Sequence, residues 1–274
     1  MTDTTTIVPS RLAETFARVA AEGRTAIMPF ATAGYPTLAK SEEIILALVE
    51  AGADGIEIGI PFSDPIADGA AVQRTSQVAL EQGTRLKDVL QLVRNLRAKG
   101  VTVPLLLMGY LNPVHHYGVE RYVKDATEAG ADGFIIPDLP AEESDLIRTP
   151  ALAYGRDLIY MVAPTSTEAR LEETAKRASG FIYCVAVTGV TGARDSLSAT
   201  LGDYLDRIRT HTDVPLVVGF GISKPEHIAE VGKHAQGAIV ASALINYLDA
   251  LPSDDLAAGA TRFMTYLRGE GDLA

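Results

Sequence analysis

Two carboxylates stand where an apolar strand gives way to a loop. Residues 55–69 read GIEIGIPFSDPIADG, so Glu57 lies inside an alternating apolar run and Asp68 follows eleven residues later. If the flanking isoleucines pack outward against helices, alternation turns Glu57 to the inner face of the sheet.

A buried ion pair is the alternative role for Glu57, but the strands hold no lysine or arginine to pair with it. An unpaired interior carboxylate has a raised pKa, which suits proton transfer near neutral pH. Asp68, and still more Asp64 before a proline, would also fit as turn residues.

The elements that must position this pair alternate between short apolar strands and amphipathic helices. Strands are expected over residues 25–30, 54–60, 103–108, 133–137, 157–162, 181–187, 215–219 and 237–240. Helices are expected over residues 9–22, 41–51, 85–99, 119–129, 141–153, 168–178, 200–211, 225–232, 242–249 and 255–268. Eight strand–helix units in roughly 250 residues predict an α/β fold, a single (β/α)8 TIM barrel with an extra N-terminal helix. An open doubly wound sheet would have fewer strands, and no linker divides the chain, so residues 1–274 are expected to form one domain.

A short segment recurs along the chain. EAGADGI at 50–56 returns as EAGADGF at 128–134, and in both places a helix ends and Asp-Gly leads into a strand. The repeat indicates a reused helix-to-strand turn in two quasi-equivalent units.

Three glycine-rich or helix-opening turns follow the last three strands. They read TGVTG at 188–192, GFG at 219–221 and VASAL at 240–244, with Ser242 placed as the N-cap of a helix. In barrels of this class the active site lies at the carboxyl ends of the strands, and phosphate often binds after the last two. The turns therefore predict a phosphate site beside the two carboxylates.

Composition and charge exclude several classes of partner and chemistry. The net charge of −11 argues against nucleic acid and against an anionic membrane surface. No signal peptide or membrane span is recognisable, and the single cysteine, Cys184, indicates a reducing compartment, so a soluble cytoplasmic protein is expected. The adjacent His115 and His116 lack the pattern of a metal site, and no metal is expected. The strands lack lysine, which excludes a Schiff-base aldolase.

The motifs together are similar to those of the alpha chain of tryptophan synthase, an indole-3-glycerol-phosphate lyase. The resemblance covers essentially the whole chain, and its most specific part is PFSDPIADG beside the Glu57 strand. It also includes MPFATAGYP, LMGYLNP, GFIIPDLPAEES, GVTGAR and VGFGIS. It implies acid–base retro-aldol cleavage of indole-3-glycerol phosphate to indole and glyceraldehyde 3-phosphate in L-tryptophan biosynthesis. It also implies that this chain holds no cofactor and joins a pyridoxal-phosphate beta chain in an α2β2 tetramer.

The resemblance assigns roles to individual residues. Glu57 would move protons at indole C3 and at the glycerol hydroxyl, and Asp68 would face the indole N–H. The substrate would contact Phe30, Ile135, Tyr183, Thr191, Gly192, Gly219, Phe220, Gly221, Ala241 and Ser242, and the loop 188–195 would close over it. The beta chain would contact Pro61, Asp64 and Asn112.

One residue departs from the family pattern, since Ala241 stands where the family usually has glycine. Alanine keeps its N–H, so phosphate binding is expected to survive. Two other interpretations stay open at this point, a stand-alone lyase that needs no partner and a phosphate-binding allosteric partner without chemistry. A ribulose-phosphate epimerase would need histidine metal ligands at the strand ends, which the sequence lacks.

Overall fold

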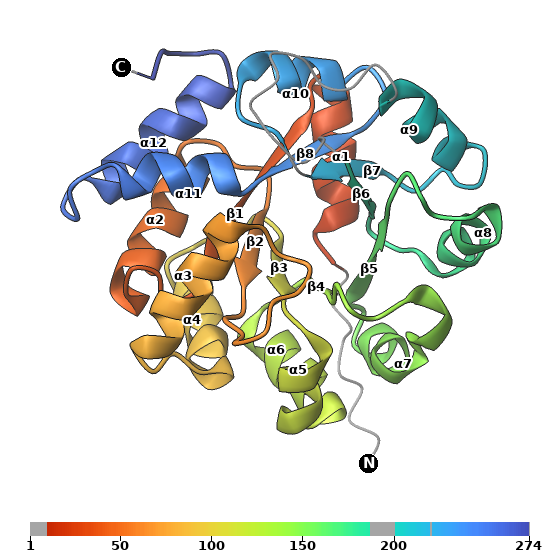
Figure 1. The fold of residues 1–274 in the computed structure, drawn as a ribbon, viewed down its shortest axis with the longest axis horizontal. Coiled ribbons are helices and arrows are strands. Elements are labelled where there is room, and N and C mark those ends of the chain that lie inside the picture. Colours follow the sequence, from red (N-terminus) through yellow and green to blue (C-terminus); the bar gives the residue numbers. More distant parts are fainter. Residues whose placement is uncertain (1–9, 187–200, 220, 274) are drawn as a thin grey trace.

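A closed barrel of eight parallel strands forms the centre of the molecule, surrounded by helices (Figure 1). The computed structural model describes residues 10–186, 201–219 and 221–273. Each strand pairs with the next along the chain, and β1 pairs with β8 to close the barrel. This confirms the predicted fold. The strands are β1 Ala26–Thr32, β2 Ile56–Gly59, β3 Leu105–Met108, β4 Gly133–Ile135, β5 Asp157–Val162, β6 Ile182–Val185, β7 Leu216–Gly219 and β8 Gly237–Val240.

The helices occupy the outside of the barrel and one of its ends. Before the fifth strand they are α1 Leu12–Ala21, α2 Leu38–Glu50, α3 Ala70–Glu81, α4 Leu86–Ala98, α5 Leu111–Tyr117, α6 Val119–Ala129, the short 3-10 helix η1 Ala141–Glu143 and α7 Asp145–Ala153. After it come α8 Glu168–Arg177, α9 Leu201–Arg209, α10 Pro225–Val231, α11 Ser242–Asp249 and α12 Leu256–Leu267. Within the described residues, every helix is too short or too polar to cross a bilayer.

Two of these helices were not expected, and one expected helix is divided. The turn rich in proline and aspartate ends at Gly69, and α3 begins directly after it, so two helices rather than one follow β2. Helix α5 contains Pro113 in its first turn, where a proline costs little because that N–H has no partner within the helix. The segment predicted as one helix over 141–153 separates at Ser144 into η1 and α7.

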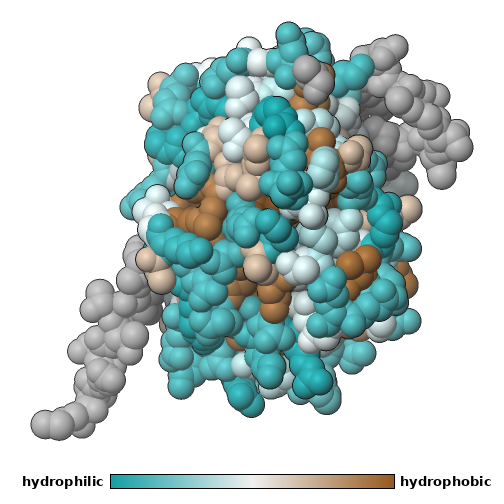
Figure 2. All heavy atoms as spheres, turned by 90° about the vertical axis from the view of Figure 1, so that its left-hand side faces the viewer, coloured by the Kyte–Doolittle hydropathy of each residue, from teal (hydrophilic) through white to brown (hydrophobic). Residues whose placement is uncertain are grey.

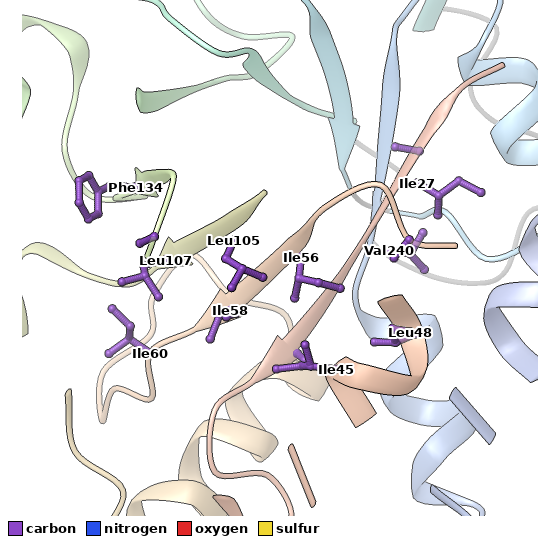
Figure 3. Packing of buried hydrophobic residues seen from close by; sticks show 14 of the residues in the cluster. Ile27, Ile45, Leu48, Ile56, Ile58, Ile60, Leu105, Leu107, Phe134 and Val240 are labelled. Carbon is purple, nitrogen blue, oxygen red and sulfur yellow. The ribbon is translucent and has the colours of Figure 1, made fainter. Parts of the chain in front are cut away.

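The alternating strands bury two separate sets of side chains. Ile56 and Ile58 of β2 belong to the outer cluster, which packs between strands and helices and includes Ile45 and Leu48 of α2 (Figure 3). A second cluster fills the barrel itself. It contains Ala26, Met28, Leu106, Ile135, Ile159, Tyr183, Val217 and Ile239. Glu57 therefore lies on the opposite face from its two isoleucine neighbours, as the alternation predicts.

The extra helix α1 closes the amino-terminal end of the barrel. Its residues Leu12, Phe16 and Val19 belong to the inner cluster, and the Phe16 ring meets Phe181 edge-on with centroids 6.0 Å apart. Apolar contact therefore joins α1 to the barrel interior.

The aspartates of the repeated EAGADG segment hold α1 in place. Asp54 accepts a hydrogen bond from the Ile27 N–H of the neighbouring strand and pairs with Arg18 of α1 at 3.0 Å. Asp132 accepts one from the Leu105 N–H and pairs with Arg11 at 2.9 Å. In both copies of the repeat, the aspartate thus forms ion pairs that fix α1 at the end of the barrel opposite the predicted site.

Candidate active site

Glu57 is enclosed inside the barrel. Its register partners are Phe30 of β1 and Leu106 of β3, and it is only 1% exposed. Among the described residues, its Oε1 atom has no hydrogen-bond partner. Burial raises the pKa of Glu57 to about 8, and the nearby charge of Asp68 adds to the rise. Glu57 is therefore mostly protonated at neutral pH and can donate a proton.

Asp68 lies on the loop between β2 and α3, close enough to Glu57 for their charges to interact. Partial burial raises its pKa to about 6, while the Tyr110 hydroxyl acts in the opposite direction. Tyr110 fixes this loop, because its hydroxyl oxygen accepts the Ala67 N–H at 2.9 Å and its ring stacks on Phe62. The sequence places Tyr110 after the third strand but does not mark it as a site residue.

The two carboxyl groups differ in their charge at neutral pH. With pKa values near 8 and 6, Glu57 is mostly neutral and Asp68 mostly ionised. An environment that separates the pKa values of two neighbouring carboxyls supplies one acid and one anion.

Two glycines make room for two aromatic rings beside Glu57. A Cβ at Gly219 would overlap the ring of Tyr183, and one at Gly59 would overlap the ring of Phe30. Tyr183 is 4% exposed, and burial together with both carboxylates raises its pKa. The positions of the Phe30 and Tyr183 rings therefore require a glycine at the facing point of the neighbouring strand.

Apolar side chains complete the inner surface. Ile135 is fully buried in the inner cluster, where Met108 also packs. Phe30 forms a further small cluster with Ala71, Val72 and Ile245, at the starts of α3 and α11. The space near Glu57 and Asp68 is thus bounded by aromatic and aliphatic groups.

Three of the predicted phosphate-binding residues lie at the ends of β7 and β8. Gly221 has a φ of +79°, a backbone conformation that favours glycine. The prediction that Ser242 is an N-cap is wrong, because Ala241 occupies that position and Ser242 is the first residue of α11. A Cβ at Gly69 would be 3.8 Å from Ser242 Oγ, so the end of the Asp68 loop lies beside this helix start. The predicted residues Thr191, Gly192 and Phe220, and the loop 188–195, lie outside the described residues.

A buried histidine supports the turn after β7. His227 of α10 is 6% exposed, and its Nδ1 accepts a hydrogen bond from the Ser223 N–H at 3.2 Å. Within the described chain, its Nε2 atom is buried without a hydrogen-bond partner. Burial lowers its pKa, which favours the neutral ring that can accept at Nδ1. Sequence reasoning missed His227, and only its spacing from the GFG turn could have marked it.

The residues expected to meet a partner lie on one side of the Asp68 loop and after β3. Asp64 and Asn112 are exposed, whereas Pro61 is buried. Ile66, between Asp64 and Asp68, is 85% exposed. Asp64, Ile66 and Asn112 are therefore accessible to a partner.

Other chemically active side chains lie away from this site. Cys184 is buried in the outer cluster, as expected for a core residue. His115 and His116 are exposed on α5. Among the described residues, no group of three or more histidine, cysteine, aspartate or glutamate side chains is arranged to hold a metal ion.

Comparison with known proteins assigns the chain to a family. A family model described as "Tryptophan synthase alpha chain" matches residues 16–269. The alpha chain of Roseiflexus sp. (strain RS-1) is 52% identical over 95% of this chain and 100% of its own length. That of Chloroflexus aurantiacus is 52% identical over 94% of this chain and 97% of its own. The crystal structure of subunit alpha from Legionella pneumophila str. Paris superposes with a TM-score of 0.88 at 34% identity, covering 96% of this chain and 98% of that one. The chain therefore belongs to the tryptophan synthase alpha chain family.

Proposed function

We propose that Glu57 and Asp68 carry out the cleavage of indole-3-glycerol phosphate to indole and glyceraldehyde 3-phosphate. As a member of its family, the chain is a carbon–carbon lyase of tryptophan biosynthesis. The observation that carries the assignment of these residues is the interaction of two carboxyl groups, Glu57 inside the barrel and Asp68 on the loop after β2, with pKa values near 8 and 6. One neutral acid beside one anion is what the retro-aldol reaction requires.

The proposed reaction uses Glu57 twice. The protonated carboxyl of Glu57 gives its proton to indole C3, which converts the ring to an indolenine that can accept an electron pair. The C3–C3′ bond then breaks, its electrons return to the ring, and the C3′ hydroxyl becomes the aldehyde. The Glu57 carboxylate takes the hydroxyl proton and is restored, so no external acid is consumed.

Asp68 would stabilise the charge that develops on the ring. When C3 is protonated, positive charge appears at the indole nitrogen, and an ionised carboxylate facing that N–H lowers the energy of the transition state. The pKa of Asp68 near 6 keeps it ionised at neutral pH. Burial strengthens its effect, since the local dielectric is low.

The substrate would be oriented at both ends. Phe30, Ile135 and Tyr183 would contact the indole ring, with the Tyr183 ring placed by its fit against Gly219. The phosphate would bind backbone N–H groups at Gly221, Ala241 and Ser242, where a helix start favours an anion. Thr191, Gly192 and Phe220 are proposed to complete this contact.

The chain is also proposed to act with a beta chain. The exposed residues Asp64, Ile66 and Asn112, on the Asp68 loop and at the start of α5, are the proposed contacts of that chain. We propose an α2β2 assembly in which the beta chain holds pyridoxal phosphate and receives the indole, while this chain needs no cofactor. We further propose that residues 1–274 form one domain and that the protein is cytoplasmic.

The test is indole release from indole-3-glycerol phosphate by the purified chain, with and without a beta chain. We expect weak activity alone, a strong increase with the partner, and loss of activity in Glu57→Gln. The matched control is Glu172→Gln, which changes an exposed glutamate of α8 in the same way. Full activity without a partner would favour the stand-alone lyase. Phosphate binding without any indole release would favour the non-catalytic partner and refute the roles of Glu57 and Asp68.

A further inference from the structure

A second cavity, of about 180 Å³, lies behind one wall of the candidate active site. It is enclosed by the end of β1, by α2, and by α11 with the start of α12, which lie together on the left of Figure 1. Figure 2 faces this side of the molecule and shows hydrophobic residues between polar ones. Its lining does not include Glu57, Asp68 or Tyr183, so it is separate from the proposed reaction site.

The chemistry of the lining selects an apolar, uncharged ligand. Its walls are mainly aliphatic and aromatic, formed by Phe30, Ile44, Leu244, Ile245, Leu248 and Leu251. An apolar cavity of roughly 150 Å³ excludes water and binds benzene-sized molecules, so this one is large enough for a small aromatic ring system.

The polar rim offers no cation to hold an anion, but it keeps a hydrogen-bond acceptor for a neutral ligand. Asp249 is the charged residue among the described lining, and its carboxylate already accepts hydrogen bonds from the Tyr35 hydroxyl and from Arg74. The described lining holds no lysine or arginine, and the cation next to it, Arg74, already pairs with Asp249, so a phosphate or carboxylate would find no free cation there. A neutral molecule with one N–H donor could still bind, because a carboxylate accepts up to about four hydrogen bonds.

Phe30 is shared between the cavity and the reaction site. It lines the cavity, is the register partner of Glu57, and has its ring packed against the empty space at Gly59. Ile245 is shared in a similar way, because it lines the cavity and packs with Phe30 beside the start of α3. A molecule in the cavity would therefore press on the wall that the substrate ring is proposed to contact.

We propose that this cavity is a second binding site for a small uncharged aromatic molecule with an N–H group, and that its occupant restrains Phe30. Indole fits the description and would be released one wall away, so the choice of indole rests on the proposed function. The cavity and its preference for a neutral ring do not depend on that function.

The experiment uses the full chain with the Glu57→Gln substitution, saturated with indole-3-glycerol phosphate to occupy the reaction site. Indole is then titrated while the methyl resonances of Ile44 and Leu248 report on the cavity and that of Ile135 on the barrel. We expect saturable shifts at Ile44 and Leu248 and none at Ile135. Unchanged Ile44 and Leu248 resonances at millimolar indole would overturn the proposal, whether or not Ile135 responds.

Three variants test whether indole binds in the cavity itself. Leu248→Phe fills it, and Ser253→Phe covers its exposed rim with little risk to folding, so each should weaken indole binding by at least about tenfold. Leu152→Phe changes an exposed leucine of α7 and should have no effect. Equal affinity in all three variants would also overturn the proposal. Failure of the proposed function would be seen separately, as absent indole release by the unmodified chain, while the cavity resonances would still respond.

Discussion

Replacing Glu57 by glutamine should change how the stability of the protein depends on pH. In the unfolded chain the pKa of this carboxyl is about 4.5, and in the barrel burial raises it to about 8. Between these values the folded state holds a proton that the unfolded state has lost, so rising pH favours unfolding. Each pKa unit corresponds to about 1.36 kcal/mol, which gives roughly 3 kcal/mol at pH 7, about 4 kcal/mol at pH 8 and a limit of about 5 kcal/mol above pH 9.

The sign of the effect makes the assay specific. Below pH 4.5 the carboxyl is protonated in both states and costs nothing, so the two proteins should then differ little. As pH rises to 8, the free energy of unfolding should fall in the unmodified chain relative to Glu57→Gln, and between pH 8 and 9 the gap should level off. Urea denaturation at steps from pH 4 to 9 measures this gap.

The matched control is Glu172→Gln, whose exposed side chain lies on α8. Its stability should run parallel to that of the unmodified chain across the whole range, because an exposed carboxyl gains no desolvation penalty on folding. A gap for Glu57→Gln that is absent, or that narrows as pH rises, would refute the idea that Glu57 is buried without a compensating charge.

Substitutions at four further positions test other parts of the structure. Asp68→Asn should remove the fall in kcat/KM below about pH 6, since the proposed reaction needs this carboxyl group ionised. The assay is a profile of kcat/KM from pH 5 to 9, and a fall that persists in the variant would belong to another group. Gly219→Ala should lower kcat/KM by about tenfold or more, because the new methyl group overlaps the Tyr183 ring, and unchanged steady-state kinetics would contradict that packing. Asp132→Asn should lower the free energy of unfolding, measured in urea, by about 3–5 kcal/mol with little change in kcat, because it leaves the guanidinium groups of Arg11, Arg97 and Arg156 without their shared anion. A loss below about 1 kcal/mol would show that these groups are solvated. His227→Leu should raise KM for the substrate at constant kcat, because it removes the acceptor of the Ser223 N–H. His227→Asn, whose Oδ1 can accept in place of Nδ1, should restore KM. Equal KM values in the two variants would exclude this hydrogen bond as the cause.

The fold could be predicted from the sequence because its strongest signals are periodic. All eight strands were expected near their observed positions, since nearly continuous apolar runs bounded by glycine and proline are typical of strands buried on both faces. The inward direction of Glu57 followed from the same alternation. These features depend only on residues close together in the sequence, so one sequence is enough to predict them.

The features that were missed depend on contacts between distant segments. Helix α3 follows a loop directly instead of another strand, and the divided helix at Ser144 depends on the contact of that hydroxyl with Tyr160, sixteen residues away. The importance of Tyr110 appears only when its hydroxyl meets the Asp68 loop, 43 residues earlier in the chain. The second cavity combines β1 with helices from the other end of the chain, so no local pattern indicates it.

The ion pairs and the aromatic contact that hold α1 have a consequence for the order in which the protein folds. Arg11, which caps this helix, pairs with Asp132, 121 residues later, and Phe16 of the helix packs on Phe181. During synthesis, the apolar face of α1 therefore lacks part of its docking site until the segment that carries Phe181 has been made. The helix precedes every strand of the barrel in the sequence, but it reaches its native position only late in folding.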